Sequence, residues 1–294
     1  MKKVLAIILA VIMVLSLAAC GGGSNQGGGG NKTPTYPKLM GKLHQGPGWV
    51  INELYLWNER METKVYTYEI LPDTFDVKSG EKLPVIIFTH GNRGNADSLI
   101  SEPKILVADG IAGFTFECCG GSAVAPKSDV VEVSTSSRVT DLETVIDYVK
   151  TLDWVDKDRI YIYGQSQGGK VVMLCAPHHN DDIAGVMIES SGIGDGPMED
   201  YNVVPGTWTE FLPAEGQDWR DYVKGWKGDV IIFNSELDGN LVEVGEYTKS
   251  VYDQRDSGTC EFYFCPQGAH TFNAFSEEGQ QIALNAMRKM VLGE

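Results

Sequence analysis

The chain has 294 residues and a formal charge of −16, with 40 acidic side chains against 24 lysines and arginines. Because a strongly negative protein repels phosphate groups, this charge argues against nucleic acid and anionic membrane surfaces as partners. The six cysteines show no C-x-x-C spacing, so the composition gives no sign of a zinc site or a disulfide framework.

The first residues predict an export signal. Lys2 and Lys3 precede an apolar run over residues 4–19, which is short for a spanning helix and typical of a secretory signal peptide. Leu17-Ala18-Ala19-Cys20 resembles the lipobox of bacterial lipoproteins. This resemblance implies removal of residues 1–19, acylation of Cys20 and an extracytoplasmic protein anchored to the cell membrane by lipid. The alternative is a plain secretory signal that ends in cysteine by chance.

A glycine-rich segment follows Cys20. Residues 21–30 hold no side chain that could build a core, and chains of this composition behave as flexible coils. We therefore expect residues 20–36 to form a tether and residues 37–294 to form one domain. A domain of this length can bury enough apolar surface to need no disulfides, so we expect the remaining cysteines to be mostly free thiols.

Strand-like and helix-like segments alternate along the domain. Residues 65–70 alternate as a half-exposed antiparallel edge strand would, whereas residues 84–89 form a continuous apolar run typical of a buried parallel strand. Such alternation predicts a mostly parallel sheet with helices on both faces. Further strands are predicted at 112–116, 160–163, 185–188, 230–233 and 261–264, and helices at 139–149, 171–174, 242–252 and 277–291.

Residues 191–228 interrupt this alternation with aromatic, glycine, proline and acidic residues in no clear period. Long segments of this kind inside a compact domain are usually lids or binding loops. We therefore predict a small inserted lid whose aromatic side chains line a substrate pocket. The alternative is an insertion whose aromatics only pack on the domain surface. The predicted pocket residues are Tyr201, Trp208, Trp219 and Trp226.

The pentapeptide Gly164-Gln165-Ser166-Gln167-Gly168 lies between the predicted strand at 160–163 and an apolar helix. A G-x-S-x-G sequence in this position is typical of a nucleophile elbow, which presents a serine at the carboxyl edge of a sheet. Residues without a Cβ let the strand and helix approach closely. The pattern predicts that Ser166 is a catalytic nucleophile.

A nucleophilic serine needs a base and an acid that orients the base, and in this arrangement both follow the serine along the chain. His270 comes late, after the strand at 261–264 and before the last helix, so we predict that it is the base. Asp238 and Glu236 both follow the strand at 230–233. We favour Asp238, because the turn Asp238-Gly239-Asn240 suits an acid-bearing loop and its shorter side chain would hold the imidazole more firmly.

Acyl transfer also needs hydrogen-bond donors for a developing oxyanion. One predicted donor is the backbone N–H of Gln167, directly after the serine. The other is expected in the loop that follows residues 84–89, where His90-Gly91-Asn92 suggests the N–H of Asn92. We interpret His90 as a donor that stiffens this loop rather than as a second base.

Three segments together resemble the α/β-hydrolase superfamily, and within it small bacterial esterases of the cinnamoyl and feruloyl type. They are residues 90–94, residues 114–122 and residues 164–169. Two positions depart from such esterases: Glu117-Cys118-Cys119 replaces an aspartate- or arginine-bearing tract, and Gln165 stands where histidine is common. The resemblance implies the α/β-hydrolase fold and a serine carboxylic-ester hydrolase. Its substrates would be small acyl esters, such as hydroxycinnamoyl or acetyl esters of plant polysaccharide.

Two other function classes remain open at this point. A serine peptidase of the prolyl-oligopeptidase type shares the elbow and the residue order, but usually carries an N-terminal propeller for which this chain is too short. A catalytically inactive binding lipoprotein would be expected to have lost one of the three residues, and all are present. The sequence carries no motif for a metal or organic cofactor, so we expect none, and it leaves the oligomeric state open.

Overall fold

The computed structural model describes residues 35–122, 124–131, 134–193, 217–239, 241–266, 268–270 and 276–293. The predicted signal peptide, nearly all of the predicted tether and most of the predicted lid therefore lie outside the described residues. Within the described residues, no helix combines the length and the apolar content needed to cross a bilayer.

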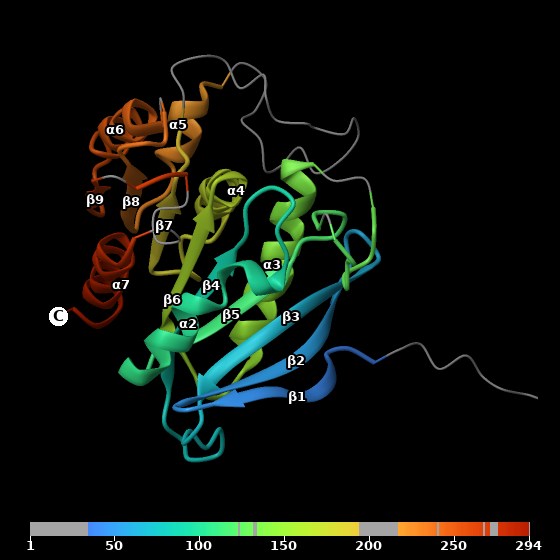
Figure 1. Ribbon diagram of the computed structural model, residues 1–294. Coiled ribbons are helices and arrows are strands. Elements are labelled where there is room, and N and C mark those ends of the chain that lie inside the picture. Colours follow the sequence, from blue (N-terminus) through green and yellow to red (C-terminus); the bar gives the residue numbers. More distant parts are fainter. Residues whose placement is uncertain are drawn as a thin grey trace, which may run out of the picture. The chain divides into compact units, whose positions relative to one another are not determined.

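Nine strands in the described part of the chain form one sheet, in the order β1-β2-β3-β5-β4-β6-β7-β8-β9. The six strands β5, β4, β6, β7, β8 and β9, in that order across the sheet, pair in parallel. On the other side of β5, the strands β3, β2 and β1 extend the sheet with antiparallel pairing (Figure 1). The strands are β1 (Lys38–Gly46), β2 (Trp49–Asn58), β3 (Thr63–Pro72), β4 (Leu83–Thr89), β5 (Ala112–Glu117), β6 (Val155–Gln165), β7 (Gly185–Glu189), β8 (Asp229–Ser235) and β9 (Cys260–Cys265).

Helices cover both faces of this sheet, as the core clusters show. Side chains of α3, α4, α5 and α6 share one apolar cluster, whereas those of α2 and α7 belong to a second cluster on the opposite face (Figure 1). The α-helices are α2 (Ser101–Leu106), α3 (Thr135–Thr151), α4 (Gln167–Cys175), α5 (Trp219–Val223), α6 (Leu241–Tyr252) and α7 (Glu277–Leu292). Three short 3₁₀ segments are η1 (Ala96–Leu99), η2 (Val107–Asp109) and η3 (Ala176–His178).

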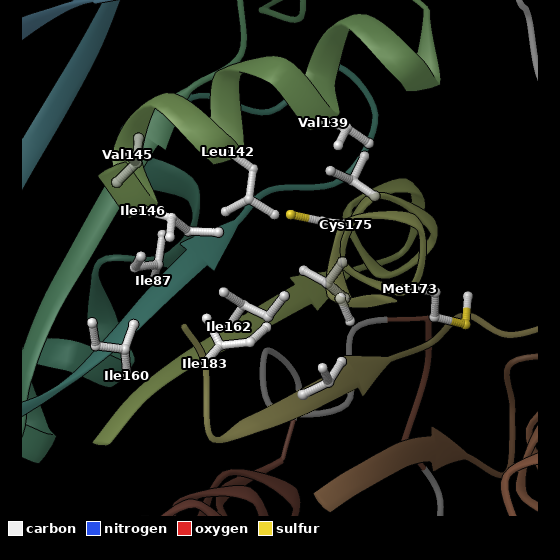
Figure 2. Close-up of a cluster of buried hydrophobic side chains, with 14 of the residues drawn as sticks. Ile87, Val139, Leu142, Val145, Ile146, Ile160, Ile162, Met173, Cys175 and Ile183 are labelled. Atoms are coloured by element: carbon white, nitrogen blue, oxygen red, sulfur yellow. The ribbon is translucent and has the colours of Figure 1, made fainter. Parts of the chain in front are cut away.

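Continuous apolar runs produce this two-faced packing, because successive side chains of a strand point to opposite faces. Ile87 and Ile162 join the cluster under α3 and α4, while Phe88 and Tyr163, one residue further along each strand, join the opposite cluster. Figure 2 shows Leu142 and other side chains of α3 above the side chains of β4 and β6. Burying each such aliphatic side chain stabilises the fold by about 1.5–3 kcal/mol relative to exposure.

The N-terminal strands differ from the sequence prediction. Residues 65–70 do lie in an antiparallel strand, but β3 is internal, paired with β2 on one side and β5 on the other, and most of its residues are buried. The prediction of an edge strand was therefore wrong. The edge on this side of the sheet is β1, which the sequence did not reveal because its residues, apolar Leu39 and Met40 included, are mostly exposed and so show no buried period.

The described cysteines agree with the prediction of free thiols. All five, Cys118, Cys119, Cys175, Cys260 and Cys265, are free, and all except Cys260 are buried. Burial raises the pKa of the Cys118 thiol to about 12, so this side chain acts as a small apolar group at ordinary pH.

Candidate functional site

Ser166 lies in the sharp turn between β6 and α4. Its backbone has φ 54° and ψ −118°, a conformation that is strained for a residue with a side chain. Close backbone contacts hold the turn in place: the Ser166 N–H donates to the Glu189 carbonyl at 2.8 Å. A Cβ on Gly168 would lie 2.2 Å from the Thr89 carbonyl oxygen, so the turn packs directly on the end of β4.

The structure brings Ser166, His270 and Asp238 together in a hydrogen-bonded series. Ser166 Oγ lies 2.9 Å from His270 Nε2, and His270 Nδ1 lies 2.7 Å from Asp238 Oδ1. The Asp238 side chain is 6% exposed and that of His270 is 52% exposed, so the carboxylate is sheltered while the imidazole borders solvent. A series of this geometry can take a proton from a hydroxyl as the hydroxyl attacks a carbonyl carbon.

Two backbone hydrogen bonds join the loop that carries Asp238 to the segment that carries His270. The Leu237 N–H donates to the Gly268 carbonyl at 2.8 Å, and the Glu236 N–H donates to the Cys265 carbonyl at 3.1 Å. These contacts are possible because β8 and β9 are parallel neighbours whose carboxyl ends meet at one edge of the sheet. These two bonds hold the backbone segments that carry Asp238 and His270 close to each other.

The two predicted oxyanion donors lie on either side of the serine. Gln167 is the first residue of α4, and the first N–H groups of a helix have no carbonyl acceptor within it. Gly91 touches the nucleophile from the β4 side, since a Cβ there would lie 3.2 Å from Ser166 Cβ. Asn92 is the next residue, in a turn that is closed by a Gly94 N–H to Gly91 carbonyl bond of 3.3 Å.

His90 stiffens this loop, as the sequence interpretation expected. The ring is 1% exposed; its Nε2 accepts the Cys118 N–H at 3.0 Å, and its Nδ1 lies 2.7 Å from the Gly91 carbonyl oxygen. Since Nε2 is an acceptor, the proton resides on Nδ1 and is donated to Gly91. Burial and the positive charge of Arg138 lower the pKa of His90 to about 4, which keeps the ring neutral.

A buried carboxylate next to the elbow was not predicted. Glu189 ends β7 and pairs in register with Gln165; it is fully buried and accepts hydrogen bonds from the Tyr163 hydroxyl and, at 2.8 Å, from Gln165 Nε2. An acidic residue at the end of an apolar strand was the available signal. The sequence could not show which strand lies beside β6, so it could not place Glu189 near Ser166.

The predicted substrate-pocket residues divide into two groups. Tyr201 and Trp208 lie outside the described residues. Trp219 and Trp226 are 7% and 1% exposed, and both belong to the core cluster. Trp226 Nε1 donates to the Asp229 carbonyl at 3.3 Å. The expectation that these two tryptophans line an open pocket is therefore corrected: residues 217–228 fold back through α5 and bury them against the domain.

No group of three or more histidine, cysteine, aspartate or glutamate side chains that could hold a metal ion occurs among the described residues. The groups that the structure brings together at Ser166 are a hydroxyl, an imidazole and a carboxylate.

Known proteins resemble this chain in sequence and in structure. A profile of the prolyl oligopeptidase family matches residues 134–242. The protein Est1E from Butyrivibrio proteoclasticus, solved with ferulic acid bound, is 21% identical; the match covers 82% of this chain and 99% of that chain, with a TM-score of 0.62. Acetyl xylan esterase from Paenibacillus sp. R4 is 16% identical, with 87% and 90% covered and a TM-score of 0.61.

A third similar structure is a putative dienelactone hydrolase from Klebsiella pneumoniae. It is 16% identical, the match covers 84% of this chain and 99% of that chain, and the TM-score is 0.61. At these identities the likeness shows the fold. The chain has the α/β-hydrolase fold, with a mostly parallel central sheet and helices on both faces, as the sequence predicted.

Proposed function

We propose that this protein is a serine esterase that hydrolyses small carboxylic esters through an acyl-enzyme. The observation that carries the proposal is the series from Ser166 Oγ through His270 to Asp238, with heavy-atom separations of 2.9 and 2.7 Å. A hydroxyl in a strained elbow has little use as a structural group, whereas this geometry is what activates a nucleophile.

In the proposed first step, His270 Nε2 accepts the Ser166 proton as Oγ attacks the ester carbonyl carbon. The resulting oxyanion receives hydrogen bonds from the N–H groups of Gln167 and Asn92. His270 then protonates the leaving alcohol, and the acyl group stays on Ser166. Asp238 holds the imidazole in the Nδ1–H tautomer and stabilises its charged form.

In the second step a water molecule takes the place of the alcohol. His270 removes its proton as it attacks the acyl carbon, and the carboxylic acid leaves when Ser166 recovers its proton. Each bond broken is matched by one formed, and no other reactant is required. The two half-reactions use the same donors because both pass through a tetrahedral oxyanion.

Two similar structures guide the proposed substrate class. One was solved with bound ferulic acid and another is an acetyl xylan esterase. We therefore propose hydroxycinnamoyl or acetyl esters carried on plant polysaccharide as substrates. Esters on such a polymer would be reached outside the cytoplasm, which accords with the proposed lipid anchor at Cys20.

The match to the prolyl oligopeptidase family supports a second candidate, a serine peptidase. The match spans the elbow and ends before His270, so it covers the nucleophile but not the base. Both candidates use the same three residues, and they differ in the bond that is cleaved.

The test compares esters with amides on the purified domain from residue 35 onward. We expect turnover of p-nitrophenyl acetate and methyl ferulate, little turnover of aminoacyl p-nitroanilides, and no turnover of any of them by Ser166→Ala, which controls for host enzymes. Faster anilide cleavage would favour the peptidase. Absence of turnover on every substrate would favour an inactive binding protein and contradict the proposal.

A further inference from the structure

One peptide group connects the buried polar cluster behind the elbow to the proposed oxyanion site. It is the peptide between Gly91 and Asn92: its carbonyl belongs to Gly91, and its N–H belongs to Asn92. The carbonyl oxygen accepts the Gly94 N–H of its own turn at 3.3 Å, and it has two side-chain nitrogen neighbours, His90 Nδ1 at 2.7 Å and Arg138 Nη1 at 3.4 Å. Because the C=O and N–H of a trans peptide point in opposite directions, groups that hold the carbonyl also aim the N–H.

Arg138 is an unusual residue in this position. It lies in the first turns of α3, where the helix dipole disfavours a positive charge, and it is 1% exposed. No carboxylate forms an ion pair with Arg138 within the described chain, and its Nε and Nη2 have no hydrogen-bond partner there. The nearby buried Asp141 gives its two oxygens to Asn58 Nδ2 and to the Cys119 N–H.

The position of Arg138 is costly, because the buried guanidinium makes one hydrogen bond within the described chain and is offset by the nearby charge of Asp141, and a poorly compensated buried charge destabilises a fold by several kcal/mol. A buried charged group beside a candidate site, which stability does not account for, is a candidate for a role in that site. Packing fixes where it points: Gly121 leaves room for the guanidinium, since a Cβ there would lie 3.2 Å from Arg138 Nη2. Among the described residues, the guanidinium has one hydrogen-bond acceptor, the Gly91 carbonyl.

We propose that Arg138 and His90 are positioning residues that orient and polarise the Gly91–Asn92 peptide, so that the Asn92 N–H becomes a stronger oxyanion donor. This inference rests on the proposed esterase function. A positive charge and a neutral donor at the carbonyl oxygen both draw electron density away from the amide nitrogen. In a buried setting such chained hydrogen bonds strengthen one another, and the charge itself favours an anion nearby.

The geometry limits this effect to one side of the nucleophile. Gly91 lies against Ser166, since a Cβ in place of its hydrogen would be 3.2 Å from Ser166 Cβ, so the polarised peptide is adjacent to the residue whose oxygen attacks. The other proposed donor, the Gln167 N–H, belongs to a different peptide, whose carbonyl on Ser166 accepts the Gly169 N–H at 2.9 Å instead of an Arg138 nitrogen. The positioning residues should therefore change the reaction barrier and leave substrate binding largely unchanged.

The test compares Arg138→Met with Arg138→Lys on p-nitrophenyl acetate. We expect Arg138→Met to lower kcat by about 10–100-fold with KM within about threefold, since loss of a whole oxyanion donor costs about 10²–10³-fold. Affinity for a trifluoromethyl ketone, which forms a tetrahedral adduct with the serine, should fall by the same factor as kcat/KM. Arg138→Lys should recover part of both losses because it keeps the charge.

Thr140→Val is the matched control on the same helix. Thr140 is 1% exposed and accepts a hydrogen bond from Asn58, so its loss disturbs α3 without touching the Gly91–Asn92 peptide. We expect a lower melting temperature and kcat within about twofold of wild type. If Arg138→Met keeps wild-type kcat and ketone affinity, or if Thr140→Val loses as much kcat as Arg138→Met, the inference is overturned.

A second variant covers the case in which the Arg138 variants do not fold. His90→Gln removes the imidazole, the other side-chain donor to the same carbonyl, and it should again lower kcat and ketone affinity together with little change in KM. Unchanged kcat in His90→Gln would then overturn the inference. The wild-type protein separates the two proposals: if it hydrolyses no ester, the proposed function itself fails, whereas an active wild type with unaffected variants refutes only the positioning role.

Discussion

At the scale of single residues, Asp238 and Glu236 are two positions apart, yet it is Asp238 that contacts the imidazole of His270. Both follow β8, and the sequence left both open as the acid. The structure brings Asp238 to 2.7 Å from His270, whereas Glu236 is exposed and its N–H is tied to Cys265. The acid role therefore follows from how the turn after β8 directs each side chain, and the proximity supports the choice of Asp238.

Asp238→Asn tests that choice. An amide in place of the carboxylate should favour the wrong imidazole tautomer and lower kcat by about 10⁴-fold, with the protein still folded. Glu236→Gln is the control, made two residues away in the same loop, and its kcat should stay within about threefold of wild type. Steady-state kinetics on p-nitrophenyl acetate measures both, and the opposite ranking would move the acid to Glu236.

Residues that act locally could be predicted, and residues that act through the tertiary fold could not. Ser166 is marked by glycines beside it, and Asp238 and His270 by their places after strands; the structure brings the three together, and their catalytic roles stay predictions. The role proposed for Arg138 could not be predicted, because the sequence shows Arg138 only as one polar residue of a helix that is predicted from its apolar period. Its one local signal was a positive charge in the first turn, where the dipole disfavours it.

At the scale of elements, the elbow works because α4 packs on the end of β4 without intervening side chains. Gly168→Ala should break this contact: the added Cβ would lie 2.2 Å from the Thr89 carbonyl oxygen and 2.8 Å from that of His90. Backbone atoms cannot rotate away as a side chain can, so the loop after β4, which carries Asn92, must shift. We expect kcat/KM to fall by about 10–100-fold and stability to fall by about 1–3 kcal/mol.

Gly225→Ala is the control for a glycine substitution outside the elbow. It lies after α5, and the nearest neighbours of its added Cβ would be at 3.0 and 3.6 Å. Its kinetics should match wild type within about twofold. Wild-type kcat/KM in Gly168→Ala would show that the close approach is not required.

A second contact between elements is electrostatic and links α3 to the end of η3. His179 is 8% exposed, with Nε2 3.2 Å from Glu143 Oε1 and Nδ1 3.0 Å from Asp182 Oδ2. Burial alone lowers the pKa of the imidazole, but hydrogen bonds with Cys175, Glu143 and Asp182 outweigh burial and raise it to about 11. The ring is therefore charged in the folded protein at neutral pH.

The pH dependence follows from the sign of that shift. A histidine whose folded pKa exceeds its unfolded value of about 6.5 stabilises the fold fully below that pH and loses the contribution as pH rises toward about 11. His179→Gln should therefore cost about 1–3 kcal/mol at about pH 6 and much less at about pH 10. Urea unfolding of wild type and variant at both pH values measures the difference, with His178→Gln as the neighbouring control; a cost independent of pH would contradict this account.

The elements themselves were largely predictable because the α/β core repeats a simple pattern. The predicted apolar strands from residue 84 onward and the predicted helices all occur, within a few residues of their expected ends. The misses have physical reasons. The exposed strand β1 shows no buried period. Trp219 and Trp226 have the residue type of a binding loop, and only their tertiary contacts with the core show that they are buried.

At the scale of the whole molecule, the proposed lipid anchor at Cys20 would hold the protein on the cell membrane. Cys20 lies outside the described residues, so the proposal depends on the lipobox-like sequence. Expressed in bacteria with a clickable fatty acid, the full chain should carry the label, and Cys20→Ala should not. Ser24→Ala, in the adjoining tether, is the control and should be labelled like wild type. Equal labelling of Cys20→Ala would place the lipid elsewhere.

The formal charge of the whole molecule, −16, is compatible with the proposed substrates. Neutral acyl esters and acetylated or feruloylated glycans carry no charge for this surface to repel, whereas polyanionic polymers would be held away. The sheltered Asp238 and the half-exposed His270 fit the same picture, since the ester must reach the imidazole from solvent while the carboxylate stays protected.

The most direct test of the account is the site of covalent modification by a fluorophosphonate, read by mass spectrometry of the intact protein and its peptides. We predict one adduct per chain, on the peptide that contains Ser166, with loss of esterase activity in proportion to labelling. Ser166→Ala should take up no reagent. An adduct on another residue, or an esterase that resists the reagent, would contradict the proposal that Ser166 is the nucleophile.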